Sequence, residues 1–139
     1  MIKSAQERTK ERNRKVSSPF IHMYTDSHCH ITCDRLYGRI DEIIDHAKEA
    51  GISQMLIMCT SRKELERALF LKDQHPNLFK VAFGWFPGDA RDVTKEDLDD
   101  LRKICRKGKL DVLGEIGLDY YWDKSFNEEQ KELFIKQLE

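Results

Sequence analysis

The feature that most constrains the fold is a regular alternation of apolar, strand-like segments and amphipathic helical segments, repeating about every thirty residues. The clearest strand is Gln54–Cys59, a continuous apolar run of the kind that is buried on both faces of a parallel sheet. After it, Ser61 and Glu64 have the spacing of a capping box and predict a helix to about His75, where Pro76 stops it. Four such pairs predict parallel strands joined by right-handed crossovers.

The other three pairs follow the same pattern. The first strand is entered through Phe20–Tyr24, and further strands are predicted at residues 78–83 and 111–116. Residues 31–37 are predicted as a loop. The predicted helices are one that carries Ile40, Ile43, Ile44 and Ala47 and ends at Gly51, one that opens at Thr94 and Asp97 and ends near Gly108, and one that is capped by Asn127 and Gln130 and carries Leu133, Phe134 and Leu138.

This alternation predicts an α/β fold of a particular size. A closed (β/α)8 barrel needs about 250 residues, whereas the chain has 139. We therefore expect a TIM-like (β/α)8 barrel of which residues 23–139 supply about the first four βα units, the N-terminal half. A doubly wound sheet shows the same alternation, but the sequence has no glycine-rich phosphate-binding fingerprint to support it.

The end of the first strand carries two histidines, His28 and His30, in the segment Asp26-Ser27-His28-Cys29-His30. Side chains alternate between the faces of a strand, so the two imidazoles should point the same way and Cys29 should face away. Two histidines at this spacing are also consistent with an ordinary polar strand end. Taken alone, they do not distinguish a metal site from that simpler interpretation.

A carboxylate at the end of another predicted strand favours the metal site over the simpler interpretation. The fourth predicted strand runs directly into Glu115, which lies between Gly114 and Ile116-Gly117. Burying a carboxylate there costs several kcal/mol unless a cation meets it. Because the carboxyl ends of parallel strands share one edge, His28, His30 and Glu115 are predicted to hold a divalent metal ion.

Composition sets limits on the class of protein. Charged residues make up 35% of the chain and there is no long apolar run, so we expect a cytoplasmic protein with no membrane span. The four cysteines have no disulfide-framework spacing and are expected to be reduced. Residues 1–19 carry a net charge of +4, from six basic and two acidic side chains, which leaves −5 on the remainder. Residues 1–22 are expected to be a basic N-terminal extension outside the fold.

Three motifs together resemble the TatD-type metal-dependent deoxyribonucleases of the amidohydrolase superfamily. The segment 26–30 looks like the opening Asp-Ser/Thr-His-x-His motif of that family, and Gly114-Glu115-Ile116-Gly117-Leu118-Asp119-Tyr120-Tyr121 is very similar to its central motif. The segment 130–138 resembles the helix that follows the central motif. The resemblance covers residues 23–139 and is continuous in order and spacing.

The resemblance implies a TIM-like barrel with one to three divalent ions, with Mg, Zn and Mn as the candidates. It implies His28 and His30 on one ion, Glu115 bridging to a neighbour, and DNA as the substrate. The remaining ligands of the family, two histidines and an aspartate from later strands, have no counterpart in this sequence. In the third loop the family usually shows Gly-x-His-Pro-His, whereas residues 84–88 read Gly-Trp-Phe-Pro-Gly.

Further residues near these motifs are candidates for catalysis or substrate binding. Glu115, Asp26 and Asp119 are the predicted catalytic residues: Asp26 would orient a ligand imidazole, and Asp119 would contact water or a ligand. Ordinary turn or loop-capping roles fit both aspartates as well. The aromatic run 120–122 would stack on an unpaired base, or would pack at the mouth of the barrel.

The leading functional hypothesis is a metal-dependent hydrolase that cleaves DNA phosphodiester bonds. One alternative keeps the metal site and changes the substrate to a small amide, ester or phosphoester. Another is a catalytically silent, truncated metal-binding protein. Four strands of a barrel leave open sheet edges, so self-association or pairing with the missing C-terminal half is also expected.

Overall fold

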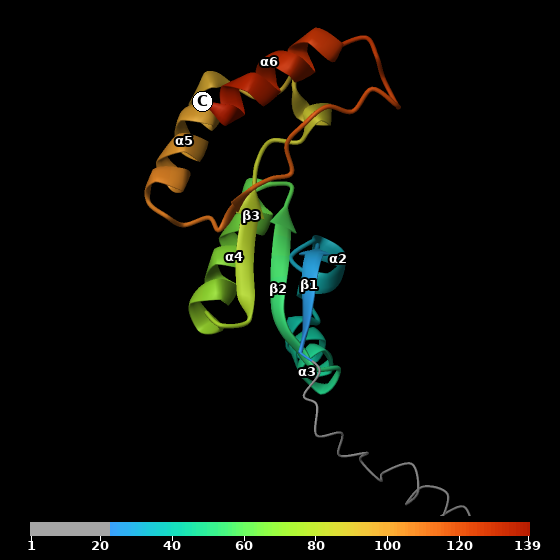
Figure 1. Ribbon diagram of the computed structural model, residues 1–139, viewed down its shortest axis with the longest axis vertical. Helices are drawn as coiled ribbons and strands as arrows, with labels where there is room; N and C mark the ends of the chain where they lie inside the picture. The colour runs from blue at the N-terminus through green and yellow to red at the C-terminus, as the bar shows by residue number, and fades with distance from the viewer. Residues whose placement is uncertain (1–22) are drawn as a thin grey trace, which may run out of the picture.

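The computed structural model describes residues 23–139 and shows a parallel four-stranded sheet. The strands are listed in chain order: β1 (Tyr24–Cys29), β2 (Ile52–Cys59), β3 (Phe79–Phe83) and β4 (Val112–Leu113). They lie side by side in the same order, β1-β2-β3-β4 (Figure 1). A doubly wound sheet reverses its strand order at a switch point, whereas a barrel does not, so this sequential order favours the barrel. The predicted extension, residues 1–22, lies outside the described residues.

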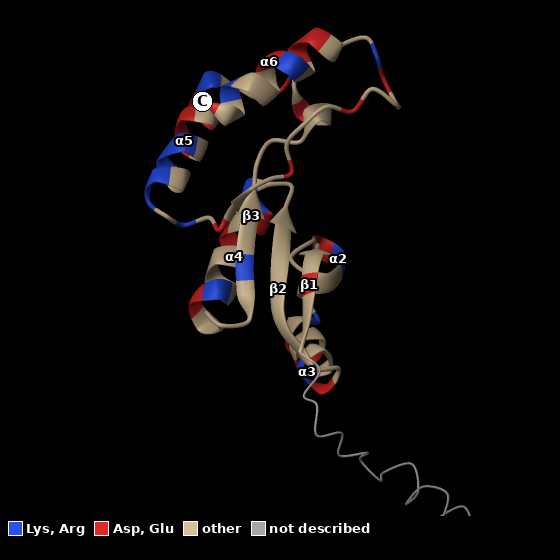
Figure 2. Ribbon diagram, in the orientation of Figure 1, with Lys and Arg blue, Asp and Glu red and all other residues tan. Residues whose placement is uncertain are grey.

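Helices connect and follow the strands. They are α2 (Asp34–Tyr37), α3 (Ile40–Glu49), α4 (Arg62–Gln74), the 3-10 helix η1 (Pro87–Asp89), α5 (Lys95–Arg106) and α6 (Asn127–Leu138). Charged side chains are concentrated on these helices, while β2 carries none (Figure 2). Among the described residues, no helix combines the length and the apolar character that a membrane span requires.

The apolar run in β2 forms the centre of the core, as its composition predicts. Ile57 and Cys59 are fully buried in β2, and Phe79, Val81 and Phe83 are fully buried in β3. Helices α3 and α4 pack on these strands through Ile44, Ala47, Leu65, Ala68 and Leu71, which are all buried. Each large apolar side chain buried in this way stabilises the fold by about 1.5–3 kcal/mol.

Two local predictions differ from the structure. The predicted fourth strand, 111–116, is shortened to β4, because its partner β3 ends at Phe83 and the last ladder bond runs from Gly114 N to the Phe83 carbonyl at 3.2 Å. The predicted loop 31–37 contains the short helix α2, which no side chain caps. Four residues are too few to show a helical period in the sequence.

The predicted helix caps are correct at α5, half correct at α4 and wrong at α6. Thr94 and Asp97 form the full reciprocal capping box at α5. Ser61 accepts a hydrogen bond from Glu64 N at 3.3 Å, but the Glu64 carboxylate turns to the N–H and hydroxyl of Thr60, so the box is not reciprocal. Helix α6 has no side-chain cap at all, because Gln130 is buried beneath the preceding loop.

Candidate metal centre

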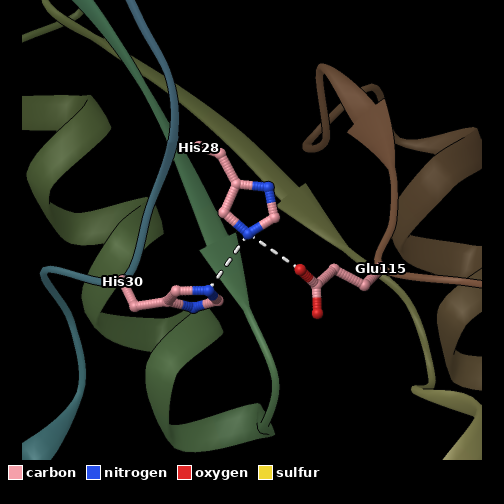
Figure 3. Close-up of side chains that lie close together, drawn as sticks. All are labelled: His28, His30 and Glu115. Atoms are coloured by element: carbon pink, nitrogen blue, oxygen red, sulfur yellow. Dashed lines mark hydrogen bonds and ion pairs between the residues drawn. The ribbon is translucent and has the colours of Figure 1, made fainter. Parts of the chain in front are cut away.

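The candidate site is built where the parallel strands end. His28 is the penultimate residue of β1, His30 follows the strand by one residue, and Glu115 lies two residues beyond β4. Parallel strands bring their carboxyl ends to one edge of the sheet, and this edge is where barrels place their active sites. The order of the strands therefore joins side chains that are far apart in the sequence (Figure 3).

The two imidazoles point the same way, as strand alternation predicts. Their Nε2 atoms lie 3.1 Å apart, and the ring centroids are separated by 5.0 Å with an interplanar angle of 67°. Cys29 faces the opposite side, where it is buried and its thiol contacts the Leu56 carbonyl at 3.3 Å. Burial, with the nearby Asp26 charge, raises the pKa of the Cys29 thiol to about 12, so this cysteine is a packed side chain rather than a nucleophile.

Glu115 completes the cluster. Its Oε1 lies 2.8 Å from Nε2 of His28, and one ligand atom from each of His28, His30 and Glu115 lies within 4.8 Å of the others (Figure 3). The His28 side chain is 51% exposed and that of Glu115 is 29% exposed, so the cluster is open to solvent on one side. An ion and its water molecules have room to approach from that side.

The hydrogen-bond pattern around His30 determines which ring nitrogen carries a proton. Nδ1 of His30 lies 3.1 Å from the carbonyl oxygen of Met58, at the end of β2. A carbonyl only accepts, so Nδ1 is the donor and a neutral His30 presents a lone pair at Nε2. Two acceptors, His30 Nε2 and the Glu115 carboxylate, then face His28 Nε2, which has at most one proton to share. A divalent cation would satisfy all three atoms at once, so the donor set fits a metal.

Asp26 and Asp119 lie near this cluster but make backbone contacts. Asp26 accepts a hydrogen bond from the backbone N–H of His28 at 3.1 Å rather than from an imidazole. Asp119 accepts one from the N–H of Tyr121 at 3.0 Å. In both contacts the carboxylate accepts from the N–H two residues further on, a local backbone role like the turn and loop-capping roles that are the simpler alternatives. Their predicted catalytic roles stay predictions.

An open cavity of about 590 Å³ lies beside the cluster. His28 and Glu115 line it. The cavity continues over the loops that follow β3 and β4, and its wall there includes Phe86, Pro87, Leu118 and Asp119. Asp119 therefore shares a cavity with two of the candidate ligands even though its carboxylate is engaged elsewhere. The cavity offers space for a substrate that is larger than a single ion.

Two glutamines of α6 support the site in a role that was not predicted from the sequence. Gln130 and Gln137 are seven residues apart and both are buried. Gln130 accepts from the N–H of Asp119 at 2.8 Å and donates to its carbonyl at 2.9 Å. Gln137 makes the same pair of bonds with Trp85, at 2.7 and 3.0 Å. Two polar residues on the apolar face of a predicted helix were the available signal, since buried amides need partners.

Comparisons with known proteins agree with the motifs and with the fold. A family model described as "TatD related DNase" matches residues 25–139. The chain is 33% identical over 116 residues to the uncharacterized metal-dependent hydrolase YabD of Bacillus subtilis, a match that covers 84% of this chain and 45% of YabD. It is 36% identical over 98 residues to the 3'-5' ssDNA/RNA exonuclease TatD of Erwinia tasmaniensis, covering 70% of this chain and 38% of that protein.

A solved structure supports the same conclusion. The crystal structure of YjjV, a TatD homolog from Escherichia coli K12, superposes with a TM-score of 0.75 at 26% identity and covers 86% of this chain and 46% of YjjV. The prediction of a parallel half-barrel is therefore confirmed. The chain spans about half the length of the relatives it matches. From the family match and these relatives together, the chain belongs to the TatD-related DNase family.

Proposed function

We propose that the protein is a metal-dependent hydrolase that cleaves phosphodiester bonds in DNA, with His28, His30 and Glu115 as ligands of a divalent ion. The observation that carries the proposal is the convergence of three ligand atoms within 4.8 Å at the carboxyl edge of the sheet. Two imidazoles and a carboxylate form a donor set that suits Zn²⁺ and Mn²⁺, and Mg²⁺ is the third candidate. Relatives named as a metal-dependent hydrolase and as an ssDNA/RNA exonuclease support the reaction class.

Individual residues of the chain have distinct roles at the proposed metal site. When bound, a divalent ion neutralises phosphate charge and lowers the pKa of a coordinated water. The Met58 carbonyl holds His30 in the tautomer whose Nε2 lone pair faces the site. Asp26 fixes the backbone at His28 through a 3.1 Å hydrogen bond, and so positions its ring. Glu115 brings the negative charge that retains the cation.

Cellular location and partners belong to the same proposal. Cys29, Cys33, Cys59 and Cys105 are all free thiols, which supports a reducing compartment, and we place the protein in the cytoplasm. DNA is the proposed substrate. The alternative of a silent metal-binding protein differs only in the second of the two measurements below.

The test separates metal binding from hydrolysis. The purified protein is stripped with chelator and reloaded with Mg²⁺, Mn²⁺ or Zn²⁺, and its bound metal is measured by elemental analysis. Cleavage of a single-stranded oligodeoxynucleotide is then assayed with and without the C-terminal half of a full-length relative. We expect little cleavage by the chain alone and metal-dependent cleavage when that half is present. His30→Ala should reduce this cleavage by at least about a hundredfold, at or above the top of the range seen when a supporting group of a metal site is lost, because His30 is itself a proposed ligand. The matched control is His46→Ala, which removes an exposed histidine of α3. Metal binding without cleavage would favour the silent protein, and equal cleavage by His30→Ala would exclude this site.

A further inference from the structure

Two aromatic side chains in the loop between β4 and α6 project into solvent. Tyr121 is 80% exposed and Trp122 is 83% exposed, the two highest values among the large apolar side chains that the structure describes. Their rings meet edge to face, with centroids 4.8 Å apart and planes at 89°. This loop is the long orange segment that runs from β4 to α6 in Figure 1. Two adjacent exposed aromatic rings offer a contiguous apolar surface on which a ligand can bind.

The loop is fixed immediately before the pair. Gln130, which is only 1% exposed, pairs with both the N–H and the carbonyl of Asp119 at 2.8 and 2.9 Å. The Asp119 carboxylate in turn accepts from the N–H of Tyr121 at 3.0 Å. Three hydrogen bonds thus order the backbone between Asp119 and Tyr121, while the ring of Tyr121 stays exposed to solvent. A ligand that binds the rings meets a surface that is already ordered, which reduces the entropic cost of binding.

The pair also lies close to the candidate metal centre. Leu118 and Asp119 line the cavity that contains His28 and Glu115. A chain extends by at most about 3.6 Å per residue, so the Cα atom of Trp122 lies within about 11 Å of that of Asp119. A single strand whose reacting phosphodiester sits at Glu115, and that continues along the cavity wall toward Asp119, can therefore reach the two rings.

We propose that Tyr121 and Trp122 form a stacking platform for an unpaired base of a single-stranded nucleic acid whose phosphodiester lies at the metal centre. The inference rests on the proposed function and assigns to it two residues that contact the substrate. Base stacking on aromatic side chains tolerates any sequence, because every base has a π face. A base paired within a duplex has its faces covered by neighbours, so the platform selects single strands or frayed ends.

The first test measures binding without catalysis. The chelator-treated protein is titrated into a fluorescein-labelled oligothymidylate, and anisotropy is recorded for the parent, Tyr121→Ala and Trp122→Ala. We expect each variant to bind about 5-fold to 150-fold more weakly. Phe70→Ala is the matched control, because Phe70 is an aromatic residue of α4 that is 58% exposed, and it should bind like the parent.

An abasic oligonucleotide of the same length separates stacking from charge. It carries the same phosphates without bases, so the parent and both variants should bind it equally. The proposal is overturned if both alanine variants bind oligothymidylate as tightly as the parent does. It is also overturned if the variants lose as much affinity for the abasic strand as for oligothymidylate.

Two further readouts distinguish this inference from the proposed function and from an internal role for the pair. If the metal-loaded parent cleaves single-stranded DNA while Tyr121→Ala and Trp122→Ala keep its KM, the function stands and the platform fails. If the parent shows no metal-dependent cleavage but the two variants lose affinity for oligothymidylate, the platform stands and the proposed function fails. Emission assigned to Trp122, by difference from Trp122→Phe, should be quenched by acrylamide in free protein and protected by oligothymidylate. A Trp122 inaccessible to acrylamide before ligand is added would show that protein covers it.

Discussion

Replacing Gln130 by leucine removes the amide that holds the loop after β4. The side chain is 1% exposed and makes two hydrogen bonds to the backbone of Asp119, at 2.8 and 2.9 Å. Leucine keeps much of the buried volume but leaves one N–H and one carbonyl without their partner. An unsatisfied buried polar group costs about 1–3 kcal/mol, so the two together cost about 2–6 kcal/mol. Because the loop borders an open cavity, water will reach part of it, and we expect the lower half of that range.

Urea denaturation of the parent and of Gln130→Leu, followed by circular dichroism, gives the free energy of unfolding for each. A loss of about 2–4 kcal/mol is a large fraction of the usual 5–15 kcal/mol. Glu132→Gln is the matched control, since Glu132 is an exposed residue of the same helix whose 3.5 Å ion pair with Lys136 contributes little. A change below about 0.5 kcal/mol in Gln130→Leu would refute the account of the loop.

Three further predictions test other parts of the structure. A Cβ at Gly84 would lie 2.5 Å from Cγ2 of Ile116, so Gly84→Ala should lower the free energy of unfolding by about 1–3 kcal/mol and weaken metal binding at the neighbouring Glu115, measured by denaturation and calorimetry. Burial opposes ionisation of Asp111, but hydrogen bonds from Lys72 and a backbone N–H prevail and lower the pKa of its carboxyl group. The resulting stabilisation is present above the ordinary pKa near 3.9 and is lost as the pH falls through the lowered pKa. Asp111→Asn should therefore have a smaller free energy of unfolding than the parent at pH 7, and the two free energies should converge in acid. Residues 23–139 produced alone should self-associate through open sheet edges in light scattering, and a monodisperse monomer would contradict this.

The strand order and the cluster could be predicted because both follow from short-range patterns. The continuous apolar run of β2 and the two-residue alternation around His28 and His30 are both visible directly in the sequence. Glu115 could be placed with them because parallel strands end at a common edge. The family motifs added specificity that spacing alone does not carry.

The parts that were not predicted depend on tertiary partners. The length of β4 is set by where β3 ends, and the sequence of β4 does not contain that information. Gln130 was assigned to a helix cap because its spacing allows one, but the structure turns it toward the backbone of Asp119, which only the folded loop presents. The contact between the Met58 carbonyl and His30 could not be predicted from the sequence either, because every residue has a carbonyl.

Metal stoichiometry tests the central claim most directly. The parent, the triple variant His28→Ala/His30→Ala/Glu115→Ala and the control His46→Ala are equilibrated with each of Mg²⁺, Mn²⁺ and Zn²⁺, desalted and measured by elemental analysis, with circular dichroism to verify folding. The account predicts at least one equivalent of bound ion in the parent and in His46→Ala, and loss of that equivalent in the folded triple variant. A folded triple variant that retains the full metal content of the parent would contradict the assignment of these three residues as the metal centre.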